Sequence, residues 1–450
     1  MTKQPINLRN AVLSMLLETA KGEKSHIVLK HYLDQHGDLE KQERAFITRL
    51  FEGTIERQIE LDYIINQISK TKTKKMKPVI LQILRMSVYQ LKYMDSVPEF
   101  AVCNEAVKLA GKRGFGTLKG FINGVLRNVA KQMDTLELPK EELERLSVQY
   151  SVPKWMLELW KQDFGMEQVR EILEHLYEER QTTLRIQLSA RSGDKETFIE
   201  AVKDSLKAES VTVTDTILPN VIRISDYDSL GRLSAFRNGW VVVQDLSSVL
   251  ASVVAAPKKG AQVIDVCAAP GGKSLCVADL LENTGIVEAR DLTEKKVQLI
   301  NENIQRTGMK NVTAKVADAT RLDEASVENA DVVIADLPCS GLGVIANKSD
   351  IKYNVSLEQI EELSKLQREI LKVVSKYVKP GGTLVYSTCT VNKKENEENA
   401  LWIEKELGFM PKEFPENFPK ELLADRNTNQ LQIFPGELGM DGFFISLFQK

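Results

Sequence analysis

The sequence has few of the residues that hold small proteins together by covalent or metal cross-links. It contains 5 cysteines and 4 histidines in 450 residues, and no two cysteines form a Cys-x-x-Cys pair. We therefore expect neither a structural zinc site nor a framework of disulfides, and we predict no metal ligands. A low and odd number of cysteines is typical of a protein that is kept reduced, so we expect a cytoplasmic location.

Long apolar runs are also missing. No stretch approaches the ~18 consecutive apolar residues of a membrane span, and the beginning, MTKQPINLRN, lacks the apolar core of a signal peptide. With 43% apolar and 27% charged residues the composition is that of an ordinary globular protein, long enough for two to four domains. We expect no membrane partner, and nothing in the sequence demands an obligate protein partner.

The net charge of −3 hides an excess of positive charge in the first third of the chain. Residues 1–140 carry 23 Lys and Arg against 15 Asp and Glu, whereas residues 141–450 carry 37 against 48. A basic segment joined to an acidic body is typical of proteins that hold nucleic acid at one end. The alternative is chance variation of a solvated surface.

Residues 263–273, VIDVCAAPGGK, have the pattern of a ligand-binding turn. The β-branched beginning predicts a buried strand, Pro270-Gly271-Gly272 ends it, and helical periodicity resumes at Lys273. A strand, a glycine turn and a helix in this order aim free backbone N–H groups at a ligand. Asp291 ends the next predicted strand, where nucleotide-binding α/β domains place an acid for ribose hydroxyls. A glycine turn alone would be an ordinary strand-to-helix connection, so further residues must decide.

The hydrophobic pattern divides the chain into three parts. Residues 6–132 have the periodicity of successive helices, residues 139–235 mix helices and strands, and strands alternate with helices from residue 236 onward. Such alternation predicts a parallel, doubly wound sheet, whose ligands lie beyond the carboxyl ends of its strands. We expect four polar residues at that edge, because each follows a predicted strand: Asp291, Asp318, Asp336 and Cys389.

Two cysteines follow neighbouring strands of that sheet, Cys339 in DLPCSG and Cys389 in YSTCT. A single cysteine is usually an inert buried thiol, and this is our interpretation of Cys103, Cys267 and Cys276. Two thiols that leave a cofactor-binding sheet at the same edge favour chemistry instead.

These motifs together resemble RNA (cytosine-carbon-5) methyltransferases, which bind S-adenosyl-L-methionine. The strings VPEFAVCNEAVKLA and GFINGVLRNVA resemble the NusB-like RNA-binding domain at the front of the RsmB-type rRNA methyltransferases of that family. The resemblance implies an all-α NusB-like bundle (1–138), a small α+β N1 subdomain (139–235) and an α/β Rossmann-like methyltransferase domain (236–450). Seven basic residues of the first domain become candidate phosphate contacts: Lys72, Lys74, Lys75, Lys112, Arg113, Lys119 and Arg127.

The resemblance also implies roles for the site residues. Cys389 would be the nucleophile, Cys339 would assist release of the adduct, and Asp336 would lie at the N3 side of the base. A thiolate that adds to carbon-6 of cytosine makes carbon-5 nucleophilic enough to take a methyl group from a sulfonium. Asp291 would bind the ribose and Asp318 the adenine amino group of the cofactor. The full implied cofactor site is Cys267, Ala268, Ala269, Pro270, Gly271, Gly272, Lys273, Asp291, Asp318 and Asp336.

We therefore predict methylation of carbon-5 of a specific cytosine in 16S rRNA, single-stranded or flipped, in naked RNA or in an assembling small subunit. A tRNA cytosine-carbon-5 methyltransferase and a non-catalytic ribosome-assembly factor remain alternatives. A DNA methyltransferase is disfavoured, because those enzymes keep only the cysteine equivalent to Cys339. One departure concerns the loop before Asp350-Ile351-Lys352. Family members often carry arginines and a proline there, whereas this chain has Ala346-Asn347-Lys348-Ser349, which puts RNA contacts of that loop in doubt.

Overall fold

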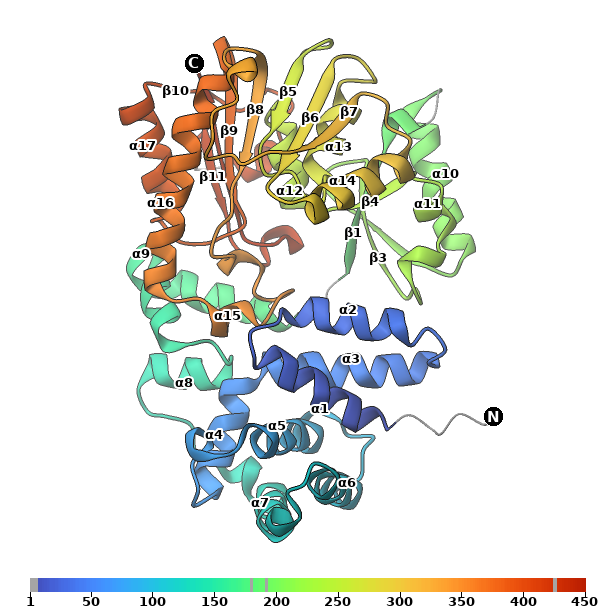
Figure 1. Ribbon diagram of the computed structural model, residues 1–450, viewed down its shortest axis with the longest axis vertical. Coiled ribbons are helices and arrows are strands. Elements are labelled where there is room, and N and C mark those ends of the chain that lie inside the picture. The colour runs from blue at the N-terminus through green and yellow to red at the C-terminus, as the bar shows by residue number, and fades with distance from the viewer. Residues whose placement is uncertain (1–6, 179–180, 191–192, 424–426) are drawn as a thin grey trace. The chain divides into compact units, whose positions relative to one another are not determined.

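The computed structural model describes residues 7–178, 181–190, 193–423 and 427–450. The chain forms two compact units (Figure 1), of which the first comprises the residues up to Leu173 together with Ile345–Asn354. The second comprises Glu174–Val344 and Val355–Lys450. A short segment from late in the sequence is thus part of the N-terminal unit. Within the described ranges, no helix combines the length and the apolar character that crossing a bilayer requires.

The regular structure described in the first unit is helical, as the apolar pattern predicts. Pro78 occupies the first turn of its helix, where its missing N–H costs nothing. Trp160 of the last long helix is fully buried in this unit. Gly165, at φ +87°, interrupts the last long helix. The helices are α1 (Leu8–Thr19), α2 (Ser25–Gln35), α3 (Lys41–Glu56), α4 (Gln58–Ile68), α5 (Pro78–Tyr93), α6 (Glu99–Lys112), α7 (Lys119–Gln132), α8 (Glu142–Gln149), α9 (Lys154–Glu174) and α15 (Ile351–Asn354).

A small antiparallel sheet begins the second unit. Its strand order is β2-β3-β1-β4, with β1 (Thr182–Ile186), β2 (Thr212–Asp215), β3 (Val221–Ser225) and β4 (Val241–Val243). The helices α10 (Lys195–Ala208) and α11 (Ser234–Arg237) share its hydrophobic core. The alternation predicted from residue 236 onward would make β4 the first strand of the large sheet, and this prediction was wrong. Leu184 pairs with Val243 and Ile186 with Val241, so β4 closes the small sheet instead.

The large sheet has eight strands, in the order β10-β12-β9-β8-β5-β6-β7, and β11 pairs with β12. Helices cover both of its faces, which confirms the Rossmann-like layering. Alternate residues of β8 divide between the faces: Val332 and Ile334 join one hydrophobic cluster, and Val333 and Ala335 the other. The first cluster contains residues of α12 (Leu246–Val253), α13 (Gly272–Leu280) and α14 (Glu294–Thr307), and the second contains residues of α16 (Leu357–Val374) and α17 (Glu397–Leu407).

The sheet is mixed rather than wholly parallel. The strands β5 (Gln262–Asp265), β6 (Ile286–Asp291), β7 (Val312–Val316), β8 (Ala330–Asp336) and β9 (Val378–Thr388) run parallel to one another. In contrast, β10 (Met410–Pro411), β11 (Gln430–Ile433) and β12 (Phe443–Gln449) pair antiparallel. The prediction of a wholly parallel sheet is therefore wrong for these last strands. A parallel pair needs a crossover connection, usually a helix, and the connection from β11 to β12 contains no such helix.

Candidate active site

The turn after β5 brings backbone close to where a ligand can lie. Gly271 has φ +103°, a conformation that a side chain disfavours, and a Cβ there would lie 3.3 Å from Ile300. The N–H of Ala268 donates to the carbonyl of Arg290 at 2.8 Å, which fixes the turn against the end of β6. Gly271 also caps α13 without a side chain, so a ligand can take the first N–H groups of that helix.

Asp291, at the end of β6, is tied to the same turn. Its carboxylate accepts hydrogen bonds from the N–H of Ala269 at 3.0 Å and the N–H of Leu292 at 2.7 Å. Lys296 forms an ion pair with it at 2.9 Å, and only 3% of the Asp291 surface is exposed. The predicted ribose acid is therefore preorganised beside the glycine turn.

Asp318 lies beyond the end of β7 and is more open than Asp291. Its carboxylate accepts from the N–H of Thr320 at 3.0 Å and from the Thr320 hydroxyl at 2.6 Å. These two bonds hold the pKa of Asp318 below its usual value. The carboxylate thus stays charged at the edge where the family resemblance implies the adenine end of a cofactor.

Lys273 and Asp336 form an ion pair at 2.7 Å, between the first turn of α13 and the end of β8. Ser387 of β9 donates its hydroxyl to the second carboxylate oxygen of Asp336 at 2.8 Å. Burial alone would lower the pKa of Lys273, but the carboxylates of Asp336 and Asp265 and a negative charge on Cys389 raise it. The ammonium therefore stays protonated, with Cys389 in its field.

The two cysteines meet, as the sequence predicts. Their sulfur atoms lie 3.3 Å apart, because Asp336 pairs with Ser387 across β8 and β9 and each strand ends in a cysteine loop. The hydrogen bond that the Cys339 thiol donates to Cys389, together with burial, raises the pKa of Cys339 well above its usual value. Cys339 thus keeps its proton and can donate a hydrogen bond to the sulfur of Cys389. Among the described residues, no cysteine forms a disulfide.

A buried glutamate connects the two cysteine loops, and no sequence pattern had indicated it. Glu395 is fully buried and accepts from the N–H of Ser340 at 3.0 Å, from Asn392 at 2.7 Å and from Gln367 at 2.9 Å. The Ser340 hydroxyl also bonds to Glu395, and it lies 2.7 Å from the hydroxyl of Thr390. Since Ser340 follows Cys339 and Thr390 follows Cys389, one carboxylate fixes both loops.

Close backbone approach fixes the rest of the Cys339 loop. The N–H of Gly343 donates to the carbonyl of Cys389 at 3.2 Å, and the N–H of Gly442 donates to the carbonyl of Gly343 at 2.9 Å. A Cβ on Gly343 would lie 2.0 Å from the carbonyl oxygen of Gly442, so any side chain there would displace the loop.

The Asp350-Ile351-Lys352-Tyr353 string belongs to the helical unit. Asp350 accepts from the hydroxyl of Ser25 at 2.5 Å and from the N–H of Ser25 at 3.3 Å. Lys352 is buried and donates to the carbonyl of Glu56 at 2.9 Å, as Tyr353 does at 3.0 Å. This string is therefore used for packing, which the sequence does not reveal.

The basic residues proposed as phosphate contacts are not equivalent. Arg113 donates to Asn10 at 3.1 Å and to Ser14 at 2.6 Å, so it ties α6 to α1. The other six are exposed on the helical unit: Lys72, Lys74, Lys75, Lys112, Lys119 and Arg127. Of the remaining cysteines, Cys103 and Cys276 are buried in hydrophobic cores, and Cys267 packs against one.

The layered sheet and the glycine turn beside a preorganised acid define the class of this protein, an S-adenosyl-L-methionine-dependent methyltransferase. The family model described as 16S rRNA methyltransferase RsmB/F matches residues 252–449, and the NusB family model matches residues 6–131. The probable ribosomal RNA small subunit methyltransferase B of Bacillus subtilis (strain 168) is 33% identical over 99% of each chain. The chain belongs to the RsmB/F family of rRNA methyltransferases.

Solved structures agree with this assignment. The crystal structure of PH0851 is similar over 100% of both chains, with a TM-score of 0.82 and 25% identity. NSun6 from Pyrococcus horikoshii, solved with SFG, is similar over 66% of this chain and 98% of its own, with a TM-score of 0.58 and 25% identity.

Proposed function

We propose that the protein methylates carbon-5 of a specific cytosine in 16S rRNA through a covalent bond between Cys389 and carbon-6 of the base. The observation that carries the proposal is the pair of sulfur atoms 3.3 Å apart, beside the Lys273–Asp336 ion pair at the edge of the sheet. A methyltransferase that acts on oxygen or on an exocyclic nitrogen has no need of a thiol.

The cofactor fits the residues at the edge of β5, β6 and β7. The N–H groups at the start of α13, the carboxylate of Asp291 and that of Asp318 would hold S-adenosyl-L-methionine, together with the turn from Cys267 to Lys273. When bound, it supplies a methyl group on a positively charged sulfur. Its carboxylate-lined site then favours that positive charge.

The electrostatics favour Cys389 as the nucleophile. A negative charge on Cys389 raises the pKa of Lys273. The same attraction works in the other direction, so the Lys273 ammonium group stabilises the Cys389 thiolate. Cys339 holds its proton and would donate a hydrogen bond to the Cys389 thiolate. Asp336, positioned by Lys273 and Ser387, would hold the N3 side of the cytosine, which makes carbon-6 easier to attack.

The Cys389 thiolate would bond to carbon-6 as the double bond between carbon-5 and carbon-6 opens, and the freed electron pair would make carbon-5 the atom that is methylated. For release, a proton would leave carbon-5 for solvent water and the bond between carbon-6 and Cys389 would break, while Cys339 would donate a hydrogen bond to the departing Cys389 sulfur. The target cytosine must be unpaired or flipped, because a base inside a duplex cannot reach a thiol in such a site.

The substrate assignment rests on similarity. The Bacillus subtilis relative is named as acting on small-subunit rRNA, and the exposed basic residues of the helical unit suit the binding of phosphates. We propose that residues 1–138 form the NusB-like RNA-binding domain, residues 139–235 the N1 subdomain and residues 236–450 the catalytic domain.

The test is methyl transfer from labelled S-adenosyl-L-methionine to 16S rRNA from cells that lack the protein, followed by bisulfite mapping. We expect one new protected cytosine in 16S rRNA and none in tRNA assayed in parallel. A protected cytosine in tRNA alone would favour the tRNA enzyme. Binding of 16S rRNA without any methyl transfer would favour the non-catalytic assembly factor.

A further inference from the structure

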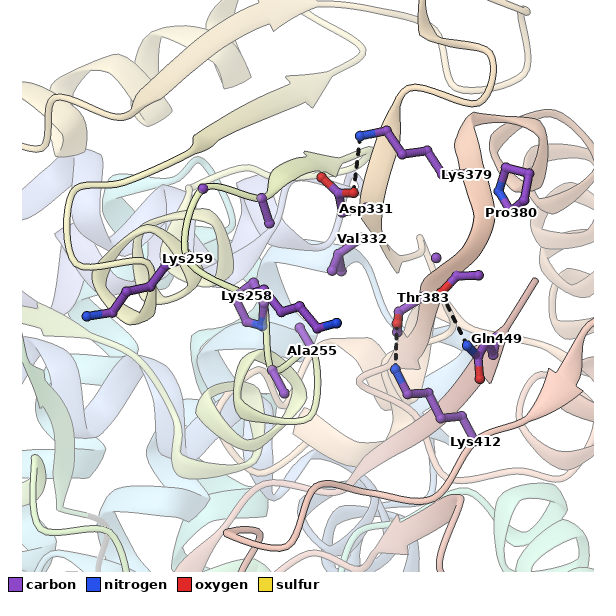
Figure 2. Close-up of a pocket in the computed structure, with 16 residues that line it drawn as sticks. Ala255, Lys258, Lys259, Asp331, Val332, Lys379, Pro380, Thr383, Lys412 and Gln449 are labelled. Atoms are coloured by element: carbon purple, nitrogen blue, oxygen red, sulfur yellow. Dashed lines mark hydrogen bonds and ion pairs between the residues drawn. The ribbon is translucent and has the colours of Figure 1, made fainter.

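A cavity of about 420 Å³ lies at the edge of the large sheet opposite the cysteines (Figure 2). Its lining includes Gly260, just before β5, Asp331 at the beginning of β8, and residues 379–383 at the beginning of β9. Asp336 and Cys389 lie at the carboxyl ends of β8 and β9, respectively. The seven residues of β8 separate the two edges by roughly 20 Å. The cavity is therefore no part of the site described above.

Its lining is strongly cationic. Four lysines but one acid contribute to it, and the acid, Asp331, is engaged by Lys379 at 3.1 Å and by the N–H of Gln262 at 2.8 Å. Among the described residues that line the cavity, no other carboxylate is present to pair with Lys258 or Lys412.

Figure 2 shows Lys258 and Lys412 converging from two different loops, whereas Lys259 points away from them. Lys259 pairs with Glu282 at 2.6 Å, which explains its direction. Lys412 donates to the hydroxyl of Thr383 at 2.8 Å, and this bond holds its ammonium group at the cavity.

The two converging ammonium groups repel each other without compensation. Burial lowers the pKa of Lys412, and the positive charge of Lys258 lowers it further. An anion between them would relieve both penalties, since it replaces the lost hydration and offsets the repulsion. An oxyanion such as phosphate suits the position, because its several oxygen atoms can accept hydrogen bonds from both ammonium groups at once.

We infer that this cavity is a phosphate-binding site, in which Lys258 and Lys412 hold a phosphate group and Lys379 adds positive charge. A volume of about 420 Å³ exceeds that of a single phosphate, so the group can carry a sugar with it. The phosphate can come from the backbone of the RNA substrate, which rests on the proposed function, or from a small free phosphate ester. If the phosphate belongs to the RNA backbone, the protein binds rRNA at the edge of the sheet opposite the target cytosine.

The test compares the double variant Lys258→Ala/Lys412→Ala with a control of equal charge, Lys207→Ala/Lys405→Ala, whose lysines lie on α10 and α17. Calorimetric titration with inorganic phosphate measures the site without RNA or methyl transfer. Binding of 16S rRNA is measured over a series of salt concentrations. A second variant, Lys258→Glu, leaves the bond between Lys412 and Thr383 intact in case the double variant folds poorly.

We expect phosphate binding to be lost in both cavity variants and retained in the control. If the phosphate belongs to RNA, affinity for 16S rRNA falls about three- to tenfold and the slope of log affinity against log salt falls by about one. Lost phosphate binding with unchanged rRNA affinity identifies a small phosphate ester as the ligand. Phosphate affinity and rRNA affinity that both stay at the control level would overturn the inference, whatever the outcome of the methylation assay.

Discussion

Glu395 accepts a hydrogen bond from the backbone N–H of Ser340 at 3.0 Å, and so holds the residue that follows Cys339. The same carboxylate binds Asn392 and Gln367, and the Ser340 hydroxyl reaches Thr390, which follows Cys389. The geometry of the two thiols thus depends on a carboxylate that is fully buried.

Glu395→Ala should therefore lower kcat for methyl transfer more than it affects the binding of S-adenosyl-L-methionine. It leaves several buried donors without an acceptor, which costs on the order of 3 kcal/mol of unfolding free energy. Glu395→Gln retains one acceptor oxygen. Its kcat and its free energy of unfolding should both lie between those of the parent protein and those of Glu395→Ala. The matched control, Glu398→Gln, changes an exposed carboxylate three residues along the chain. A kcat equal to that of the control would show that Glu395 does not position the thiols.

Lys273→Met removes the ammonium that faces Cys389. The Cys389 thiolate then loses its electrostatic stabilisation, and its alkylation by iodoacetamide at pH 7 should slow about tenfold or more. The rate should recover at higher pH, because the thiolate forms there without the ammonium. Lys295→Met, on the exposed side of α14, is the control. If Lys273→Met is alkylated as fast as the parent protein, Lys273 does not activate Cys389.

Asp350→Ala should destabilise the helical unit. Asp350 bonds to Ser25 at the beginning of α2, whose preceding residue, Lys24, provides no side-chain cap. Loss of the acceptor should cost about 1–2 kcal/mol, as loss of an N-cap does. Asp350→Asn keeps an acceptor oxygen and should cost less. Hydrogen exchange of the α2 amides measures the effect, and equal protection in all three proteins would contradict it.

The stability of the protein without cofactor should depend on Asp265. This carboxyl is buried, and burial raises its pKa from 3.8 to about 7 although Ser274 donates to it. Between those values the folded protein keeps a proton that the unfolded chain has lost. Stability therefore falls as pH rises through this window, by up to about 4 kcal/mol, and is constant above it.

Asp265→Asn should remove this contribution. The stability of the variant relative to the parent should rise between pH 4 and pH 7 and then level off, as measured by urea unfolding. Asp204→Asn, at an exposed position of α10, should show no such trend. A difference that does not change with pH would mean that Asp265 is charged in the folded protein throughout.

Much of the site could be predicted because parallel strands place their carboxyl ends together. Asp291, Asp336 and Cys389 each follow a strand, so the hydrophobic pattern was enough to bring them to one edge. Glu395 could not be predicted, since it lies in KKENEENA, where a buried acid and a solvated one look alike.

In the fold, too, local features could be predicted from the sequence and long-range ones could not. The helices of the first unit follow from local apolar periodicity, whereas the pairing of β4 with β1 and the antiparallel direction of β12 depend on contacts between distant residues. The docking of Asp350 on Ser25 joins residues 325 positions apart, and no local pattern records it.

The proposed bond between Cys389 and the cytosine can be trapped and seen. RNA that contains 5-fluorocytosine at the target cannot lose a proton from carbon-5, so an adduct formed with S-adenosyl-L-methionine present persists on a denaturing gel. We expect an adduct with the parent protein, none with Cys389→Ala, and an adduct with Cys339→Ala that accumulates even on ordinary RNA. An adduct that survives Cys389→Ala and disappears with Cys339→Ala would contradict the assignment of the nucleophile.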